Sequence, residues 1–299
     1  MQLNTPFQIW YQAARPRSLT ATYVPIALGG VIALQDGAFN VLFFVLALLG
    51  TLALQIGANL SNEYFDYAKG VEAEKTHGLG LILKQGYLTP QQVLIGAVGS
   101  FVIGSLIGLF LVSQTGWLIL WIGLAGVAVA ILYTAGPFAL AYIGLGEIAV
   151  FIFMGPLIVL GTYYVMTEKT SDQTIIGALP IAFLVAAILH ANNLRDLDAD
   201  KVSGKNTLAV RFGRRFAQGE YVVLTLGGLV MVVLLAILGQ IPATSLLSLI
   251  LLPETLRLCR IATTSEDPKE LHMVLVHTAR LHKWFGAAYV VGWLISLAL

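Results

Sequence analysis

The amino-acid sequence predicts an all-α, polytopic membrane protein with nine transmembrane helices. Of its 299 residues, 58% are hydrophobic and only 11% are charged, and the mean hydropathy is +0.83. A soluble domain has about a quarter charged residues and about half apolar ones. Apolar runs of roughly 18 residues or more, each long enough to cross about 30 Å of hydrocarbon, recur along the whole chain. We therefore expect a single transmembrane domain over residues 1–299.

The nine predicted helices follow one another with short polar connections. The second is the clearest, because residues 41–60 carry no charge before the chain reaches Glu63. In chain order, the predicted spans are residues 18–34, 41–61, 92–112, 117–134, 142–165, 174–194, 217–238, 242–260 and 282–299.

Basic residues are distributed very unevenly between the two predicted membrane faces. With the N-terminus in the cytoplasm, sixteen of the seventeen Lys and Arg residues lie on the cytoplasmic side, and only Lys169 lies opposite. Such an excess of positive charge marks the cytoplasmic loops of membrane proteins. It also supports the number of spans, since one missing or extra span would scatter these residues over both faces. We expect a multi-pass protein of the cell inner membrane with its polar chemistry on the cytoplasmic face.

Several other classes of protein are disfavoured. The N-terminal segment has no small-residue cleavage site after a short apolar core, so we expect no cleaved signal peptide. The single Cys259 excludes an intramolecular disulfide and a cysteine-based metal site. The net charge of +1 gives no indication of nucleic-acid binding, and no obligate protein partner is evident.

Two polar motifs follow spans that cross the membrane in the same direction. The first lies in NLSNEYFDYAKGVEAEK (residues 59–75) and the second in HANNLRDLDADKVSGKNTLAVRFGRR (residues 190–215). In each, an Asp follows an Asn by four residues: Asn62 and Asp66 in the first, Asn192 and Asp196 in the second, with Asp200 four residues later. Residues at this spacing share one helical face. The duplication indicates a parallel internal repeat about an axis along the membrane normal.

Two facing carboxylate clusters with cations beside them are typical of a magnesium–diphosphate site. Mg²⁺ takes oxygen ligands and is usually held by one or two carboxylates together with substrate phosphates. The nearby basic residues are Arg195, Lys201, Lys205 and Arg211. They would balance the charge of a departing diphosphate. The pattern therefore predicts Mg²⁺ as cofactor and a lipid substrate whose apolar tail lies among the helices.

Other polar residues near this face have two interpretations each. Glu72 is either a ligand of the metal or a solvated loop residue. We expect His190 to form a hydrogen bond between helices, and Glu147 to lie either in the polar cavity or outside it. Tyr133 belongs either to an interfacial aromatic belt or to a face that stabilises a cation.

Three segments of the chain resemble the UbiA superfamily of intramembrane aromatic prenyltransferases. They are NEYFDYAKGVE, LYTAGPFALAYIGLGEIAVFIFMGPLIVLGTYYV and NNLRDLDADKVSGKNTLAVRFG, and the resemblance covers roughly residues 10 to 295. It implies nine helices around a central cavity and a reaction that joins a polyprenyl diphosphate to an aromatic acid with Mg²⁺. The segments are most similar to the menaquinone branch, whose acceptor is 1,4-dihydroxy-2-naphthoate.

The resemblance also implies roles for individual residues. It assigns catalysis and metal binding to Asp66, Asp196 and Asp200. It adds Glu63 and Glu72 as metal ligands, where the superfamily usually has Asp. It assigns substrate binding to Asn62, Asn192, Lys201 and Lys205. From their positions in the sequence, we add Arg195, Tyr133 and Glu147 as candidate substrate-binding residues. Two basic residues among Arg15, Arg17, Lys84 and Arg195 are expected to hold the acceptor carboxylate.

The implied reaction is an electrophilic aromatic substitution. Diphosphate leaves, an allylic cation forms in an apolar pocket, and the electron-rich ring carbon attacks it with loss of CO₂, giving demethylmenaquinol. A sister enzyme that uses 4-hydroxybenzoate or another acceptor remains an alternative. A secondary transporter of anionic solutes is disfavoured because the middles of the spans carry few charges. A CDP-alcohol phosphotransferase is disfavoured because its denser Asp-Gly-Ala-Arg-type motif is missing.

Overall fold

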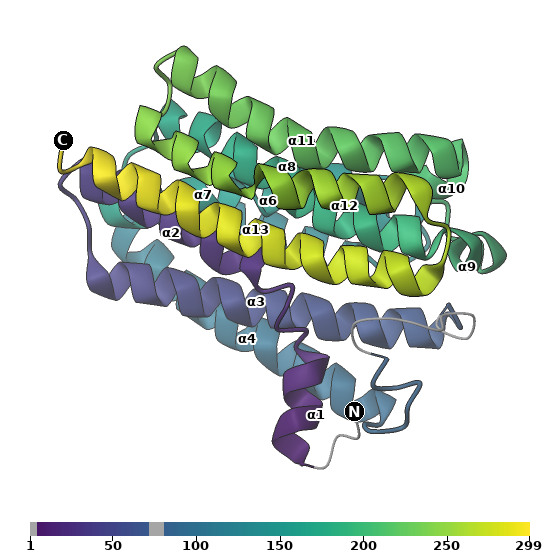
Figure 1. Ribbon diagram of the computed structural model, residues 1–299. Coiled ribbons are helices and arrows are strands. Elements are labelled where there is room, and N and C mark those ends of the chain that lie inside the picture. The colour runs from purple at the N-terminus through teal and green to yellow at the C-terminus, as the bar shows by residue number, and fades with distance from the viewer. Residues whose placement is uncertain (1–4, 72–80) are drawn as a thin grey trace.

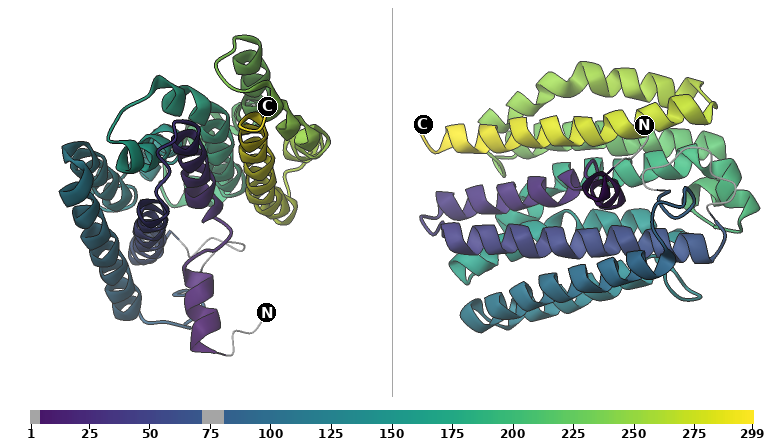
Figure 2. Two further views of the ribbon diagram at one scale, coloured as in Figure 1. Left: turned by 90° about the vertical axis from the view of Figure 1, so that its left-hand side faces the viewer. Right: turned by 90° about the horizontal axis from the view of Figure 1, so that it is seen from below.

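The computed structural model describes residues 5–71 and 81–299, and within these ranges it contains helices and no strand. Most long helices run along one common direction and form a bundle (Figures 1 and 2). The short helix α1 (Pro6–Ala13) projects from the side of the bundle, below α3 in Figure 1. Thr5 caps α1, because its hydroxyl oxygen accepts a hydrogen bond from the Gln8 N–H at 3.2 Å.

The bundle consists of α-helices and two 3₁₀ helices joined by short connections. The main α-helices are α2 (Thr20–Gln35), α3 (Val41–Ala68), α4 (Pro90–Thr115), α5 (Trp117–Leu132), α6 (Gly146–Phe153), α7 (Pro156–Thr167), α8 (Asp172–Arg195), α11 (Arg214–Ile237), α12 (Leu252–Thr264) and α13 (Pro268–Ser296). Two shorter α-helices, α9 (Leu197–Val202) and α10 (Leu208–Phe212), follow α8, and the 3₁₀ helices are η1 (Leu140–Tyr142) and η2 (Ala243–Leu251).

The helices are consistent with a multi-pass membrane protein. Among the described residues, five helical segments are long and apolar enough to cross a membrane: α3, α4, α6 with α7, α8 and α11. The helices α2 and α5 are apolar but shorter. On α4, the side chains of Ile95, Val102 and Leu106 are exposed and follow one another on one face of the helix. A continuous exposed apolar face of this kind suits contact with lipid rather than water. The nine-span count itself stays a prediction.

Helix bounds differ from the predicted spans at four places. One is the predicted span 242–260, which the structure divides into the 3₁₀ helix η2 and the helix α12. Helix α3 continues to Ala68 rather than ending at residue 61, so the whole first polar motif is helical. Helix α13 begins at Pro268 rather than at residue 282, because amphipathic sequence precedes its apolar half. The predicted span 142–165 is broken into α6 and α7 at Gly155, whose φ of −111° and ψ of −102° are not helical. Pro156, which lacks an N–H donor, starts the second piece.

Helix α8 lies inside the bundle, in contact with α2, α6, α7, α11 and α13. It ends at the same end of the molecule as α3, on the right in Figure 1. The main hydrophobic core includes Ile181, Leu184 and Leu194 of α8 and Trp293 of α13, all buried. Packing on several sides fixes the rotation of α8, and therefore the direction of the polar side chains at its end. The common direction of α3 and α8 is as predicted, while the internal repeat remains a prediction.

Candidate active site

A cavity of about 570 Å³ lies among the helices, with an apolar body and one polar region. Its apolar lining comes mainly from α3, α4, α5, α7 and α8. Its polar lining includes Arg15, Asn59, Asn62, Asp66, Tyr133, Thr134, Asn192, Arg195 and Lys205. Residues of both predicted motifs therefore contribute to one cavity. An apolar chamber with a few converging polar groups is the usual form of a site for an amphipathic ligand.

The first motif lies on the last turns of α3. The Asn62 Oδ1 accepts a hydrogen bond from the Thr134 hydroxyl at 2.9 Å. The Asp66 Oδ1 accepts one from the Tyr142 hydroxyl at 2.8 Å. Both partners come from the segment between α5 and α6, which crosses over the end of α3. This segment thus orients the two motif side chains that line the cavity.

The second motif spans the end of α8 and the start of α9. The Arg195 guanidinium donates to both carboxylate oxygens of Asp196, at 2.6 and 2.7 Å, and to the Asn192 Oδ1 at 2.8 Å. Asp200 is fully buried, and its Oδ2 lies 3.8 Å from the Lys205 Nζ. Asn192, Arg195 and Lys205 line the cavity, whereas Asp196 and Asp200 lie beside it. These two carboxylates therefore position cations that face the cavity.

Tyr142 connects the two motifs. Its hydroxyl binds Asp66, while the Lys205 Nζ lies 5.6 Å from the centre of its ring. The Lys69 Nζ lies 4.2 Å from the same ring and donates to the Thr134 carbonyl oxygen at 2.6 Å. From sequence, Tyr142 has the same two interpretations as Tyr133, an interfacial aromatic belt or a face that stabilises a cation. Its role depends on partners far apart in the chain, and no local pattern signals it.

Glu63, predicted as a metal ligand, is bound elsewhere. Its Oε2 accepts from Arg15 at 2.7 Å, and its Oε1 accepts from the backbone N–H of Ile82 at 2.6 Å and of Leu83 at 3.4 Å. The carboxylate is buried and does not line the cavity. These contacts attach the segment with Arg15 and the segment with Ile82 and Leu83 to α3. Glu63 therefore stabilises the fold rather than binding a metal at the cavity. Glu72, the other predicted Glu ligand, lies outside the described residues.

The remaining predicted residues divide between cavity and surface. Tyr133 lines the cavity, as does Arg15. Lys201 and Arg211 are exposed on the surface and do not line it. Arg17 and Lys84 are likewise exposed. Of the four candidates for holding an acceptor carboxylate, the structure thus brings Arg15 and Arg195 to the cavity.

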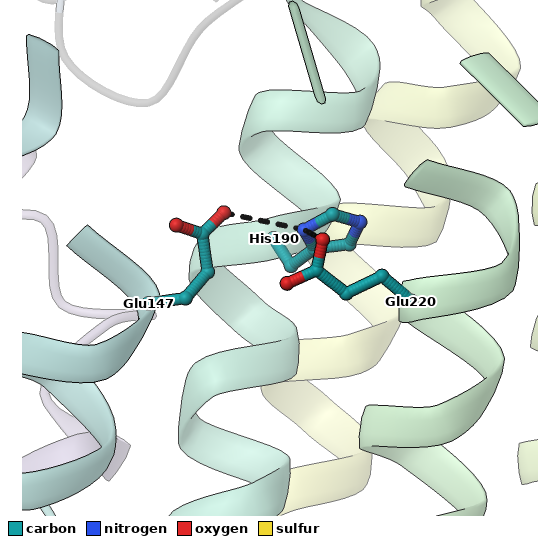
Figure 3. Close-up of side chains that lie close together, drawn as sticks. All are labelled: Glu147, His190 and Glu220. Carbon is teal, nitrogen blue, oxygen red and sulfur yellow. Dashed lines mark hydrogen bonds and ion pairs between the residues drawn. The ribbon is translucent and has the colours of Figure 1, made fainter. Parts of the chain in front are cut away.

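Glu147 does not line the cavity. Its Oε1 accepts from the Asn193 Nδ2 at 2.7 Å and lies 3.2 Å from the His190 Nδ1 (Figure 3). The His190 Nε2 lies 2.7 Å from the carbonyl oxygen of Ala217 on α11, which confirms the expected hydrogen bond between helices. The directions of the Glu147 and His190 side chains cannot be predicted from sequence alone. In a helix that is buried on several sides, a polar side chain can point either into the cavity or toward another helix.

Comparison with known proteins identifies the family of the chain. The family model described as "UbiA prenyltransferase family" matches residues 23–281. The chain belongs to this family. UbiA-family relatives named 1,4-dihydroxy-2-naphthoate octaprenyltransferase are 33% identical in Bacillus subtilis, covering 97% of this chain and 93% of that protein, and 31% identical in Escherichia coli, covering 97% and 96%.

Solved UbiA structures share the fold. A UbiA homolog from Archaeoglobus fulgidus, bound to DMAPP and Mg²⁺, has a TM-score of 0.67 at 15% identity and covers 94% of this chain and 99% of that one. The apo structure of a UbiA homolog from Aeropyrum pernix K1 has a TM-score of 0.68 at 15% identity, covering 91% and 97%. At this identity the likeness concerns the fold alone.

Proposed function

We propose that this UbiA-family protein transfers a polyprenyl group from a polyprenyl diphosphate to 1,4-dihydroxy-2-naphthoate, releasing diphosphate and CO₂ and forming demethylmenaquinol. The observation that carries the choice of acceptor is the similarity, over nearly the whole of both chains, to relatives named for that acceptor. The cavity supports the chemistry, because it combines an apolar body with carboxylates and cations at one region.

The polar region has a donor set that suits Mg²⁺ and diphosphate. The groups around it are carboxylates and amides, which are the oxygen ligands that Mg²⁺ prefers. Asp66 lines the cavity and Asp200 is buried beside it, so both are protected from competing water. We assign Asp66 and Asp200, aided by Asn62 and Asn192, to holding Mg²⁺. Asp196, whose two carboxylate oxygens both accept from Arg195, fixes that arginine at the cavity. The bound metal would neutralise charge that develops on the leaving diphosphate.

Cationic side chains complete the binding of the diphosphate. Lys205 and Arg195 line the cavity, where both can donate to phosphate oxygens. Arg195 is already fixed by Asp196 and Asn192, and a donor fixed in advance needs no reorganisation when charge develops. Tyr142 holds the Asp66 carboxylate in place with its hydroxyl. We do not include Glu63 in the metal set, since Arg15 and two backbone N–H groups hold its carboxylate.

The apolar body would receive the prenyl chain and the reacting carbon. Excluding water there protects an allylic cation from hydrolysis. The face of Tyr133, which lines the cavity, could stabilise that cation. Arg15 and Arg195 are the basic residues placed to attract the acceptor carboxylate. Because nearly all Lys and Arg residues lie on the predicted cytoplasmic side, we propose that this site opens at the cytoplasmic face of the cell inner membrane, where both substrates meet lipid and water.

The test is an assay with purified protein, a polyprenyl diphosphate and an acceptor labelled with ¹⁴C in its carboxylate. We expect labelled CO₂ to appear in step with prenylated product from dihydroxynaphthoate, and activity to vanish with EDTA and return with Mg²⁺. Product formed only from 4-hydroxybenzoate, with its label retained, would contradict the acceptor and keep the prenyl transfer. Absence of product from both acceptors would contradict aromatic prenylation itself.

A further inference from the structure

A second polar cluster lies inside the helix bundle, separate from the cavity. It consists of Glu147 on α6, His190 on α8 and Glu220 on α11, and all three side chains point toward one another (Figure 3). The exposed fraction is 0% for His190 and 5% for Glu147, while Glu220 is half-buried. None of the three lines the cavity. They therefore need an explanation independent of the diphosphate site.

The hydrogen bonds of His190 determine which of its ring nitrogens faces the glutamates as an acceptor. The carbonyl oxygen of Ala217 can only accept, so the His190 Nε2, at 2.7 Å, carries the donated hydrogen. In the neutral ring the Nδ1 then presents a lone pair. This nitrogen lies 3.2 Å from the Glu147 Oε1 and 3.5 Å from the Glu220 Oε2. Three lone-pair donors thus converge, and a positive centre between them would satisfy all three.

The charge of the cluster favours a divalent cation at that centre. Two ionised carboxylates carry a charge of −2, and burying them is costly unless they are paired or bind a metal. The Glu220 Oε2, one of the three converging donors, is buried and has no hydrogen-bond partner within the described part of the chain. A divalent cation would balance both carboxylates and provide a partner for this oxygen.

The spacing of the donors fits a small tetrahedral ion. With Zn–N and Zn–O bonds of about 2.0–2.2 Å, neighbouring tetrahedral ligands lie about 3.3–3.6 Å apart. The two distances from the His190 Nδ1, 3.2 and 3.5 Å, are close to that range. Surrounding contacts also resemble those that orient metal ligands: the Ala217 carbonyl fixes the imidazole, and the Asn193 amide donates to Glu147 at 2.7 Å.

We propose that Glu147, His190 and Glu220 form a structural Zn²⁺ site that ties α6, α8 and α11 together. The site supplies three protein ligands, and a water completes the tetrahedron. The half-buried Glu220 provides the route of entry. His190 lies two residues before Asn192, so the ion would fix α8 immediately before the second acidic motif.

The experiment measures metal content of the purified full-length protein and does not depend on activity. We expect about one Zn²⁺ per chain by mass spectrometry after loading and removal of weakly bound metal. We also expect saturating Zn²⁺ to raise the Tm by about 5 °C or more. A Co²⁺-substituted sample should show the visible absorption of tetrahedral cobalt with nitrogen and oxygen ligands.

Four variants separate this site from others. The bound Zn²⁺ should be lost in Glu220→Gln and in Glu147→Gln. It should be retained in Glu254→Gln, since Glu254 also lies beside a histidine (3.4 Å from His277) but has no third ligand within the described residues. It should also persist in the double variant Asp66→Asn, Asp200→Asn, which removes the carboxylates of the proposed magnesium site.

Two results would overturn the proposal. One is a wild-type protein that retains no Zn²⁺ and gives no tetrahedral cobalt spectrum, which would make the cluster an imidazolium–carboxylate ion pair. The other is retention of Zn²⁺ in both Glu220→Gln and Glu147→Gln. The cobalt spectrum needs only the wild-type protein, so it decides the matter even if the variants fail to fold. Either outcome leaves the proposed prenyl transfer untouched.

Discussion

Tyr142 joins the two acidic motifs through two different parts of one side chain. Its hydroxyl donates to Asp66, and its ring lies beside Lys69 and Lys205. Lys205 in turn lies near Asp200. At the residue scale, the polar region of the cavity is therefore a connected set of contacts rather than two independent clusters. Substitutions there separate the contribution of charge from that of orientation.

The first prediction concerns the charge of Asp66. Asp66→Asn keeps an oxygen that can accept from Tyr142 but removes the negative charge. We expect kcat to fall by about 10²-fold, similar to the loss of one preorganised electrostatic group. Turnover of polyprenyl diphosphate measures the effect, and the Tm in detergent checks that the protein is folded. Asp196→Asn and Asp200→Asn should behave alike.

The matched control for these variants is Asp198→Asn. Asp198 lies between the two acids of the second motif, but its side chain is 77% exposed and pairs with Arg214 at the surface. A surface ion pair contributes about 0–1 kcal/mol, so activity should remain close to that of the wild type. Near-normal turnover in both Asp66→Asn and Asp196→Asn would contradict the assignment of the two motifs.

The second prediction separates the hydroxyl of Tyr142 from its ring. A hydrogen bond to a charged group contributes about 1.5–3 kcal/mol, so Tyr142→Phe should lower kcat by about 10-fold or more. Tyr142→Leu should lower it further, because the cations also lose the aromatic face. Steady-state kinetics measure both variants. The control is Tyr67→Phe, at an exposed tyrosine next to Asp66 at the end of α3, and an equal loss there would argue against a specific role of Tyr142.

At the scale of elements, the break between α6 and α7 allows these helices to pack closely on α8. A Cβ placed on Gly155 would lie 2.5 Å from the Cβ of Ala182 and 2.8 Å from the Phe151 carbonyl oxygen. Both distances are shorter than any normal contact of a Cβ with another heavy atom. Because α7 lines the cavity and α6 carries Glu147, this approach positions one wall of the cavity and one ligand of the proposed zinc site.

The third prediction follows from that close approach. Gly155→Ala should destabilise the protein, because overpacking in a rigid interior costs about 1–3 kcal/mol. We expect the Tm in detergent to fall by about 5 °C. The control is Gly161→Ala on α7, where the nearest atoms to an added Cβ belong to Ile122 at 3.9 Å. A Gly155→Ala protein as stable as the control would show that α6 and α8 can move apart at little cost.

At the scale of the whole molecule, the two ends of the bundle differ in chemistry. One end carries both acidic motifs, the segment between α5 and α6, and α9 (Figure 1). The opposite end includes the loop between α7 and α8, where Lys169 is exposed. Apolar faces such as that of α4 cover the length between them. This polarity follows the positive-inside rule if the acidic end faces the cytoplasm.

The fourth prediction tests that orientation with single cysteines in intact cells. Val202→Cys and Lys169→Cys both replace exposed residues, at opposite ends of the bundle. A membrane-impermeant thiol reagent should label position 169 directly and position 202 only after the membrane is permeabilised. The native Cys259 is buried, so the parent protein serves as the unlabelled control. Labelling of position 202 in intact cells would reverse the topology and place the site outside.

The sequence by itself determined the class of the protein, the approximate positions of its apolar helices and the two acidic motifs. These features depend on local composition and on spacing along one helix. The tertiary structure alone decided which polar residues meet. Asp66 meets Tyr142, and Glu147 meets His190 and Glu220, although these residues come from distant segments of the chain. Glu63 binds Arg15, whereas Asn62, the residue before it, lines the cavity. The direction of each side chain depends on how its helix is rotated in the bundle, and packing against several neighbours sets that rotation.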